Sequence, residues 1–186
     1  YLTNGDLVYD AHELETETFV LFGIKKRLSK LVEKWLISHV VLTVVVSDSI
    51  RAWYEKEYDV NNVVTVLNAP PKLKIKKKFL LHEAFKLSRE KKIIIYVGGL
   101  ISGRGIEGLL SVFPEMEQDE YVLVFMGYGH LENQILSHPD LGQKIFLMPA
   151  VKPEEVTSYV ASADVGVCFL KNGSLNDDFC LPNKLF

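Results

Sequence analysis

A glycine-rich turn that holds one arginine is the first candidate for chemistry. The segment Gly98–Gly105 reads Gly-Gly-Leu-Ile-Ser-Gly-Arg-Gly and follows a short apolar run. Glycines let backbone amides approach an anion, a helix start attracts negative charge, and a guanidinium fork matches phosphate oxygens. The turn lacks the G-x-G-x-x-G spacing of dinucleotide sites and the lysine of a P-loop. We expect Gly98, Gly99, Arg104 and Gly105 to bind phosphate; a tight turn with a surface arginine is the alternative.

Two further segments follow apolar runs. Gly127-Tyr-Gly129 is a second glycine turn, and the residues from Met148 onward follow another run. The backbone N–H and C=O groups of the latter segment could form hydrogen bonds with the edge of a nucleobase. An ordinary loop without a ligand is the alternative. The candidate base-binding residues are Met148, Pro149, Ala150 and Val151.

Polar groups also gather near the C-terminal end of the chain. Asp177 and Asp178 lie in a loop that we predict after a strand. Pro182 suits the first position of a helix, which puts Asn183 and Lys184 in its first turn. A lysine there opposes the helix dipole, and this is unfavourable unless the lysine and the helix start share an anion.

His12 lies between carboxylates in the segment Asp10-Ala-His-Glu13. A histidine in this setting can serve as an acid, a base or a hydrogen-bond donor near neutral pH. A polar strand end, with the imidazole bonded to backbone, is the alternative. A metal site would need a third ligand, and the sequence does not supply one.

The candidate residues can meet in one site only if the strands before them end at the same edge of a sheet. The apolar pattern predicts such a sheet. Short β-branched runs alternate with stretches in which apolar residues recur every three or four positions. Such alternation favours parallel, doubly wound sheets, in which ligands bind beyond the carboxyl ends of the strands. The expected strands are Leu7–Tyr9, Val40–Val46, Val63–Leu67, Ile93–Val97, Val122–Met126, Ile145–Leu147 and Val165–Phe169. The expected helices are 20–37, 48–58, 80–87, 105–113, 131–136 and 154–162, and we expect Trp35, Trp53 and the phenylalanines in the core.

Charge divides the chain into three parts. Residues 1–70 carry a net charge of −3, residues 71–92 carry +7 and residues 93–186 carry −7. Paired prolines followed by clustered lysines favour extended chain, so the basic part predicts a linker and a connecting helix. We expect one domain in residues 1–70 and a second in residues 93–186.

The charge distribution also restricts the partners. Acidic domains do not attract phosphates, so nucleic acid is disfavoured as a partner. The lysines of Lys72–Lys78 could contact an anionic membrane, at about 1 kcal/mol per charge near the surface; a solvated linker is the alternative.

Composition predicts a globular, cytoplasmic chain. Hydrophobic residues make up 48% and charged residues 24%, and no apolar run approaches the roughly 20 residues of a membrane span. No signal peptide opens the sequence, and Cys168 and Cys180 lack metal-ligand spacing, which favours a reducing compartment. Both ends look cut, as in a piece of a longer two-domain protein.

Taken together, the motifs resemble family 4 glycosyltransferases. The segments similar to the family's N-terminal domain are Tyr9–Leu14, Val46–Ile50 and Val66–Pro70. The segments similar to its C-terminal domain are Tyr96–Glu107, Ala163–Gly166 and Leu181–Phe186.

This resemblance implies an α/β protein of GT-B type: two Rossmann-like, doubly wound parallel-sheet domains that face a cleft, both partial here. It implies a retaining enzyme that takes a nucleotide-diphosphate sugar as donor and needs no metal ion or other cofactor. A carbohydrate or lipid-linked acceptor, polysaccharide biosynthesis and a peripheral place at the inner face of the membrane are further expectations. We expect this piece alone to be inactive.

The resemblance also assigns residues. His12 matches the cleft histidine near the donor's sugar, and Arg104 matches a diphosphate-binding lysine. The segment Met148–Val151 matches the one that holds the nucleobase. The matches to the turn that meets the diphosphate are Pro182, Asn183 and Lys184.

Two positions depart from the family pattern. Gly99 stands where many members have a second phosphate-binding arginine, and Phe179 stands where the first of two glutamates is expected. Asp177 or Asp178 would then be the substitute contact to the donor sugar. The alternatives to a transferase are a nucleotide-sugar-binding subunit without catalysis and a sugar-nucleotide epimerase of the same fold.

Overall fold

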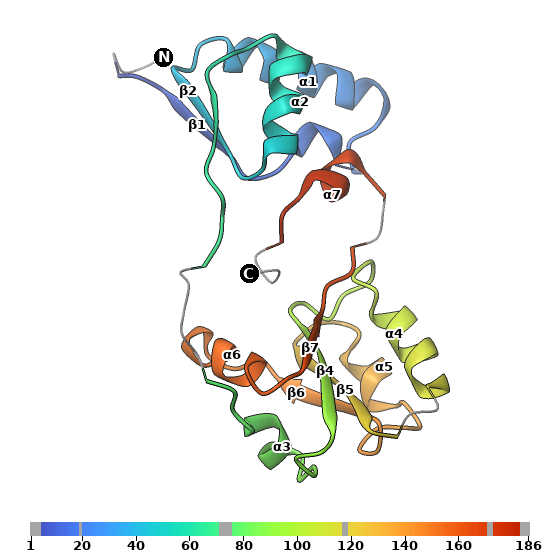
Figure 1. The fold of residues 1–186 in the computed structure, drawn as a ribbon. Helices are drawn as coiled ribbons and strands as arrows, with labels where there is room; N and C mark the ends of the chain where they lie inside the picture. The colour runs from blue at the N-terminus through green and yellow to red at the C-terminus, as the bar shows by residue number, and fades with distance from the viewer. Residues whose placement is uncertain (1–4, 19, 71–75, 117–118, 171–172, 183–186) are drawn as a thin grey trace. The chain divides into compact units, whose positions relative to one another are not determined.

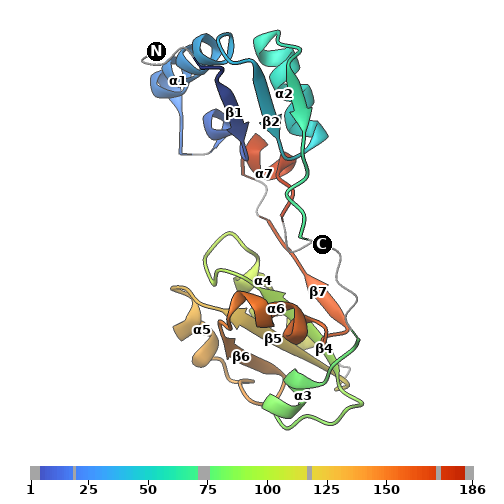
Figure 2. The ribbon, with the colours of Figure 1, turned by 90° about the vertical axis from the view of Figure 1, so that its left-hand side faces the viewer.

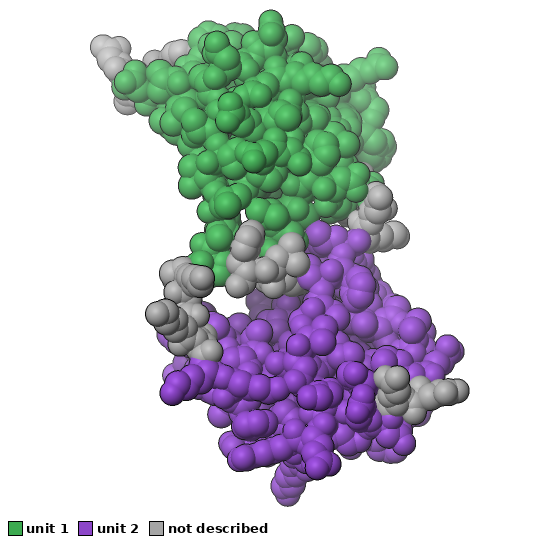
Figure 3. Space-filling model, in the orientation of Figure 1, with its two compact units in different colours: residues 1–71, 172–186 green, residues 72–171 purple. Residues whose placement is uncertain are grey.

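The computed structural model describes residues 5–18, 20–70, 76–116, 119–170 and 173–182. The chain divides into two compact units, coloured separately in Figure 3. Unit 1 comprises Tyr1–Pro71 together with Asn172–Phe186, and unit 2 comprises Lys72–Lys171. Each unit contains a parallel sheet with helices, so the chain is an α/β protein with two sheets of Rossmann-like character.

Unit 1 contains a three-stranded parallel sheet (Figure 1). Its strands, in the order β1-β2-β3, are β1 (Val8–Ala11), β2 (Leu42–Val45) and β3 (Val63–Thr65). Its helices are the short 3-10 helix η1 (Glu15–Glu17), α1 (Gly23–Ile37), α2 (Asp48–Tyr58) and α7 (Leu175–Phe179). The strands predicted at Leu7–Tyr9, Val40–Val46 and Val63–Leu67 are therefore present, with shifted ends.

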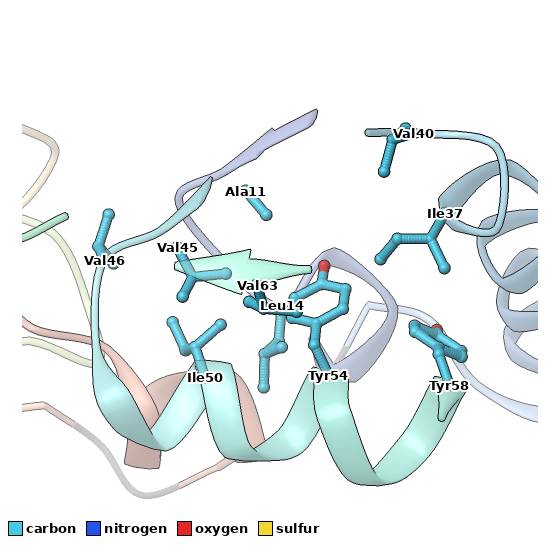
Figure 4. Packing of buried hydrophobic residues seen from close by; sticks show 10 residues of the cluster. All are labelled: Ala11, Leu14, Ile37, Val40, Val45, Val46, Ile50, Tyr54, Tyr58 and Val63. Carbon is cyan, nitrogen blue, oxygen red and sulfur yellow. The ribbon is translucent and has the colours of Figure 1, made fainter. Parts of the chain in front are cut away.

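Helix α2 provides much of the core of unit 1. The Ser47 hydroxyl accepts a hydrogen bond from the amide of Ile50 at 3.2 Å and caps the helix. Because residues four apart share a helix face, Ile50, Tyr54 and Tyr58 all turn toward the strands, as Figure 4 shows. All three are buried, Ile50 and Tyr54 completely.

Helix α1 does not bury the apolar stripe that its sequence predicts. Trp35 is 54% exposed and Phe22 is 77% exposed, so the expectation that they lie in the core is wrong. Leu28 and Val32, which are also exposed, border an apolar hollow of about 530 Å³ between α1 and β1. The physical reason is that this face of α1 has no cover among the described residues.

The C-terminal segment belongs to unit 1, although the charge pattern grouped it with residues 93–170. After β7 the chain returns, and α7 packs against η1 near the end of β1 (Figures 1 and 2). Leu175 and Phe179 of α7 pack against the core of unit 1. The predicted loop at this place is thus a short helix, which Ser174 caps by accepting from the amide of Asp177 at 3.2 Å.

Unit 2 contains a four-stranded parallel sheet in the order β6-β5-β4-β7. The strands are β4 (Lys92–Val97), β5 (Tyr121–Gly127), β6 (Ile145–Pro149) and β7 (Val165–Val167). The helices are α3 (Leu80–Ala84), α4 (Ile106–Val112), the 3-10 helix η2 (Phe113–Glu115), α5 (Glu132–Leu136) and α6 (Pro153–Val160). All the predicted elements of this region are present, and α3 is shorter than expected.

Both faces of the unit 2 sheet are buried, as parallel sheets require. Tyr96 of β4 and Phe125 of β5 pack on one face with residues of α4 and α5. Ile95 and Val124 pack on the other face with residues of α3 and α6. This alternation explains why these strands are almost continuously apolar in the sequence.

Asp164 joins three parts of unit 2. Its Oδ2 accepts from the amide of Ile93 at 3.0 Å, and its Oδ1 accepts from the Lys77 ammonium at 2.5 Å. Lys78 also bonds within the unit, donating to the Ser158 hydroxyl at 2.9 Å. Lys77 and Lys78 therefore fasten the end of the lysine run to unit 2; residues 71–75 of the predicted linker lie outside the described residues.

A carboxylate ties the helices of unit 1 to one another. Glu33 of α1 accepts from the Tyr54 hydroxyl at 2.8 Å, from the Tyr58 hydroxyl at 2.5 Å and from the Thr16 hydroxyl at 2.9 Å. Burial raises the pKa of Tyr54 and of Tyr58, and the Glu33 carboxylate raises both pKa values further. Both phenols therefore remain protonated donors.

Replacing Glu33 by alanine should destabilise unit 1, because two phenols would lose their acceptor. We expect Glu33→Ala to lower the free energy of unfolding by about 1–3 kcal/mol. Urea unfolding followed by tryptophan fluorescence measures this, since both tryptophans, Trp35 and Trp53, lie in unit 1. The control is Glu55→Ala, which removes an exposed pair with Arg51 and should cost under about 0.5 kcal/mol. Equal effects of the two variants would contradict a special role for Glu33.

Asp164 should make unit 2 sensitive to acid. Burial alone would raise the pKa of Asp164, but the hydrogen bonds from Lys77 and the Ile93 amide outweigh burial and lower the pKa. A lowered pKa means that the stabilisation is present above the ordinary aspartate pKa of about 4 and is lost as the pH falls through the lowered value.

We therefore expect Asp164→Asn to melt earlier than the wild type at pH 7, and the difference to shrink at about pH 3. Circular dichroism melts at the two pH values measure this. Asp119→Asn is the control, because Asp119 pairs with Lys144 but its side chain is 86% exposed. An unchanged difference at the two pH values would show that the Asp164 charge is not responsible.

Candidate functional site

The carboxyl ends of β4, β5 and β6 meet at one edge of unit 2. Residue pairing along the strands sets Val97 beside Met126, and Met126 beside Met148. The glycine turn at Gly98 follows β4, the second glycine turn begins at Gly127 where β5 ends, and the loop at Ala150 follows β6. The parallel sheet thus brings together three segments that are far apart in the sequence, as predicted.

The two glycine turns are in direct backbone contact. The amide of Gly98 donates to the carbonyl of Met126 at 3.0 Å, and the amide of Leu100 donates to the carbonyl of Tyr128 at 2.8 Å. A Cβ atom on Gly127 would lie 1.9 Å from the carbonyl oxygen of Gly98, and one on Gly129 would lie 2.3 Å from that of Leu100. Only glycine permits this approach, which holds the two turns together as a single wall.

A hollow of about 400 Å³ opens at this wall. Among the predicted residues, Gly98 and Gly99 line it together with Ala150 and Val151. Met148 and Pro149 belong to β6 and are not among its lining residues. The lining outside the candidate binding residues is mostly apolar: Val97, Ile101, Met126, Tyr128 and Val156.

A second hollow of about 410 Å³ lies at the other end of the first glycine turn. Gly105 lines it with Ser102, Gly103, Glu107, Phe169 and Leu170. Gly105 has φ +77°, and a Cβ atom there would lie 2.6 Å from Cβ of Phe169. The end of the turn is therefore packed against the segment that follows β7.

Arg104 places positive charge at the first glycine turn. Its side chain is half-buried, and its charge acts on the Tyr96 hydroxyl, which donates to the carbonyl of Gly99 at 2.9 Å. Burial raises the pKa of Tyr96, and the charge of Arg104 partly opposes that rise. The positive charge of Arg104 therefore lies near the Tyr96 hydroxyl and the Gly99 carbonyl to which that hydroxyl donates.

His12 lies in unit 1, in the turn after β1. Its side chain is exposed, and its Nε2 lies 3.3 Å from Oδ2 of Asp10. Ala11 before it and Leu14 after it are buried, so the turn is anchored on both sides. The imidazole is thus held on a fixed backbone and is accessible to a ligand.

The remaining predicted residues belong to unit 1 or lie outside the described residues. Asp177 accepts from the Ser174 hydroxyl at 2.9 Å and so belongs to the cap of α7, whereas Asp178 is exposed. Pro182 is half-buried in unit 1. Asn183 and Lys184 lie outside the described residues.

The described residues contain neither a candidate metal site nor a candidate membrane span. No group of three or more histidine, cysteine, aspartate or glutamate side chains is placed to hold a metal ion. None of the described helices combines the length and the apolar character needed to cross a membrane.

Comparison with solved structures finds relatives of the same fold. Sucrose-phosphate synthase from Thermosynechococcus elongatus has a TM-score of 0.70 at 17% identity, over 92% of this chain and 47% of its own. TarM has a TM-score of 0.66 at 16% identity, over 91% of this chain and 33% of its own. HepE from Anabaena, in complex with UDP, has a TM-score of 0.64 at 11% identity, over 87% of this chain and 46% of its own. The chain thus spans between a third and half of the length of these proteins.

Comparison with protein families gives a more direct result. No curated protein matches the chain. The family described as "Glycosyl transferases group 1" matches residues 77–180, which is more than half of the chain and includes every segment of the unit 2 site. The chain therefore belongs to the group 1 glycosyltransferase family.

Proposed function

We propose that the protein moves a sugar from a nucleotide-diphosphate sugar to an acceptor, with retention of the anomeric configuration and without a metal ion. The observation that carries this proposal is the wall of two glycine turns with Arg104 beside it. Such a wall offers backbone amides, and Arg104 adds a cation, at the edge of the sheet where α/β proteins bind ligands.

The proposed donor carries a uridine diphosphate. Structures of HepE contain UDP, and UDP with glucose, and a Staphylococcus aureus TarM structure contains UDP with an α-GlcNAc-glycerol. In unit 2, the diphosphate would meet the turn Gly98–Gly105, and the base would occupy the hollow lined by Ala150 and Val151.

The chemistry that this arrangement supports is the departure of a diphosphate. The bond between the anomeric carbon and the phosphate oxygen breaks, and its electron pair leaves with the nucleotide. A bond to an acceptor oxygen forms on the same face of the sugar, and the acceptor's proton passes to the departing diphosphate. Negative charge grows on the diphosphate, and fixed donors aimed at that charge lower the barrier. Arg104 supplies a charged donor. Helix α4 has only seven residues, so we assign the stabilisation to Arg104 and the turn amides rather than to the helix dipole.

His12 would act from unit 1, beside the donor's sugar. This assignment, like the GT-B arrangement of two domains about a cleft, is part of the proposal. Asp178 is exposed and remains a candidate contact to the sugar, whereas Asp177 is engaged with Ser174. Pro182, Asn183 and Lys184 complete the proposed diphosphate site.

The acceptor that we propose is a carbohydrate or a lipid-linked sugar. Contact between an anionic membrane and Lys72–Lys78 remains a prediction, and so does a cytoplasmic location. Because Lys77 and Lys78 already bond Asp164 and Ser158, that contact would depend on the other lysines of the run.

A nucleotide-sugar-binding subunit without catalysis is the second candidate. It is favoured by Gly99 and Phe179, which stand where an arginine and a glutamate are expected. Release of nucleotide from the donor distinguishes the two functions, because a binding subunit would hold the donor intact. An epimerase would convert the donor's sugar with no acceptor present.

Arg104→Ala should weaken nucleotide binding. Loss of a charge-assisted hydrogen bond costs about 1.5–3 kcal/mol, or roughly 10- to 150-fold in affinity. Ligand-detected NMR with UDP, GDP and ADP measures the binding, and we expect UDP to bind best. The matched control is Arg27→Ala, which removes an exposed arginine of unit 1 and should bind as the wild type does.

Turnover should fall when the same substitution is made in the longer two-domain protein that the sequence predicts, since we expect this piece alone to be inactive. If Arg104 stabilises the departing diphosphate as a fixed donor, its loss should reduce kcat by about 100- to 1,000-fold. Equal turnover in Arg104→Ala and wild type, or no nucleotide binding by the wild type, would contradict the proposed function.

A further inference from the structure

The return of the chain from unit 2 to unit 1 places an asparagine beside the His12 turn. Asn176 lies on α7, more than 160 residues from His12, and its side chain is only 7% exposed. Leu175 and Phe179 pack on the core of unit 1, and the Ser47 hydroxyl donates to the carbonyl of Phe179 at 3.0 Å. These contacts fix α7, and therefore Asn176, at the end of β1.

Asn176 bonds the two residues that follow His12. Its Oδ1 accepts from the backbone amide of Leu14 at 2.7 Å, and its Nδ2 donates to Oε2 of Glu13 at 3.3 Å. The orientation of the carboxamide follows from its partners, since an amide N–H can only donate and an ionised carboxylate can only accept. One side chain thus holds both the backbone and a side chain of the turn.

No other side chain of this size meets both requirements. Leucine would leave the Leu14 amide without its buried acceptor. Aspartate would still accept from that amide, but it would set a second carboxylate against Glu13. The turn therefore requires a side chain with both a hydrogen-bond acceptor and a donor, and asparagine supplies both.

We propose that Asn176 is a positioning residue for His12: by fixing Glu13 and Leu14, it sets the backbone from which the imidazole projects. The proposal rests on the role given to His12 in the proposed function. It assigns a task to α7 that differs from the sugar contact expected of its neighbours Asp177 and Asp178.

The segment that carries Asn176 also begins at the phosphate-binding turn. Phe169 follows β7 and packs against Gly105 in unit 2, and seven residues later Asn176 bonds the His12 turn in unit 1. A single stretch of chain therefore contacts the Gly98–Gly105 turn at one end and the His12 turn at the other.

The test is a charge exchange between Asn176 and Glu13. Asn176→Asp keeps the acceptor for Leu14 but opposes two carboxylates, whereas Glu13→Gln in the same chain supplies a new amide donor and restores the pairing. Asn61→Asp makes the same change at an exposed position of unit 1 and is the control. The readouts on this chain are the NMR signals of the His12 imidazole, exchange of the Leu14 amide and UDP affinity. Donor turnover is measured with the same substitutions in the longer protein.

We expect Asn176→Asp to shift the His12 signals, to speed exchange of the Leu14 amide and to leave UDP affinity unchanged. Turnover should fall by about 10- to 100-fold, with KM for the donor unchanged, since misplaced catalytic groups cost that much. The double variant should return towards wild type in every readout, and Asn61→Asp should match the wild type.

Wild-type His12 signals in Asn176→Asp, or a double variant no better than Asn176→Asp, would overturn the positioning role. Absence of UDP binding by the wild-type chain, together with absence of donor turnover by the longer protein, would contradict the proposed function instead. In that case the His12 signals and their rescue by Glu13→Gln still decide whether Asn176 positions the turn.

Discussion

The two glycine turns of unit 2 lie so close together that the carbonyl oxygens of Gly98 and Leu100 occupy the space of two absent side chains. Gly127 and Gly129 allow it, and the hydrogen bonds between the turns lock it. Because the turns extend β4 and β5 past their last paired residues, the sheet and the wall share one rigid frame. Both hollows and the placement of Arg104 depend on this contact.

Unit 1 depends instead on polar groups that hold its elements together. Its sheet is small, and one face of α1 is exposed, so apolar burial alone does not define the positions of its helices. The Glu33 carboxylate joins α1 to α2 through two tyrosines, and Asn176 joins α7 to the turn after β1. These bonds are directional, and the bond from Asn176 fixes the conformation of the turn from which the His12 side chain projects.

Much of unit 2 could be predicted from the sequence, because continuous apolar strands and glycine turns leave strong local signals. The contribution of Val156 to the apolar lining could not be predicted, because this residue of α6 reaches the hollow only in the folded unit. Helix α7 was missed since five residues with three polar side chains carry almost no helical period. Its assignment to unit 1 depends on Leu175 and Phe179 packing onto a core built from the first 63 residues. The exposed face of α1 was missed because the helical period predicts burial without showing what covers it.

The order of the segments along the chain has a consequence for folding during synthesis. A ribosome completes all of unit 2 before it releases α7, so unit 1 receives its last helix only after its neighbour has emerged. Until then the Leu14 amide lacks its acceptor, and the core of unit 1 lacks Leu175 and Phe179. Domains usually mature from the N-terminus onward during translation. In this chain α7 joins unit 1 only after unit 2 has emerged, and the His12 turn takes its final form only then.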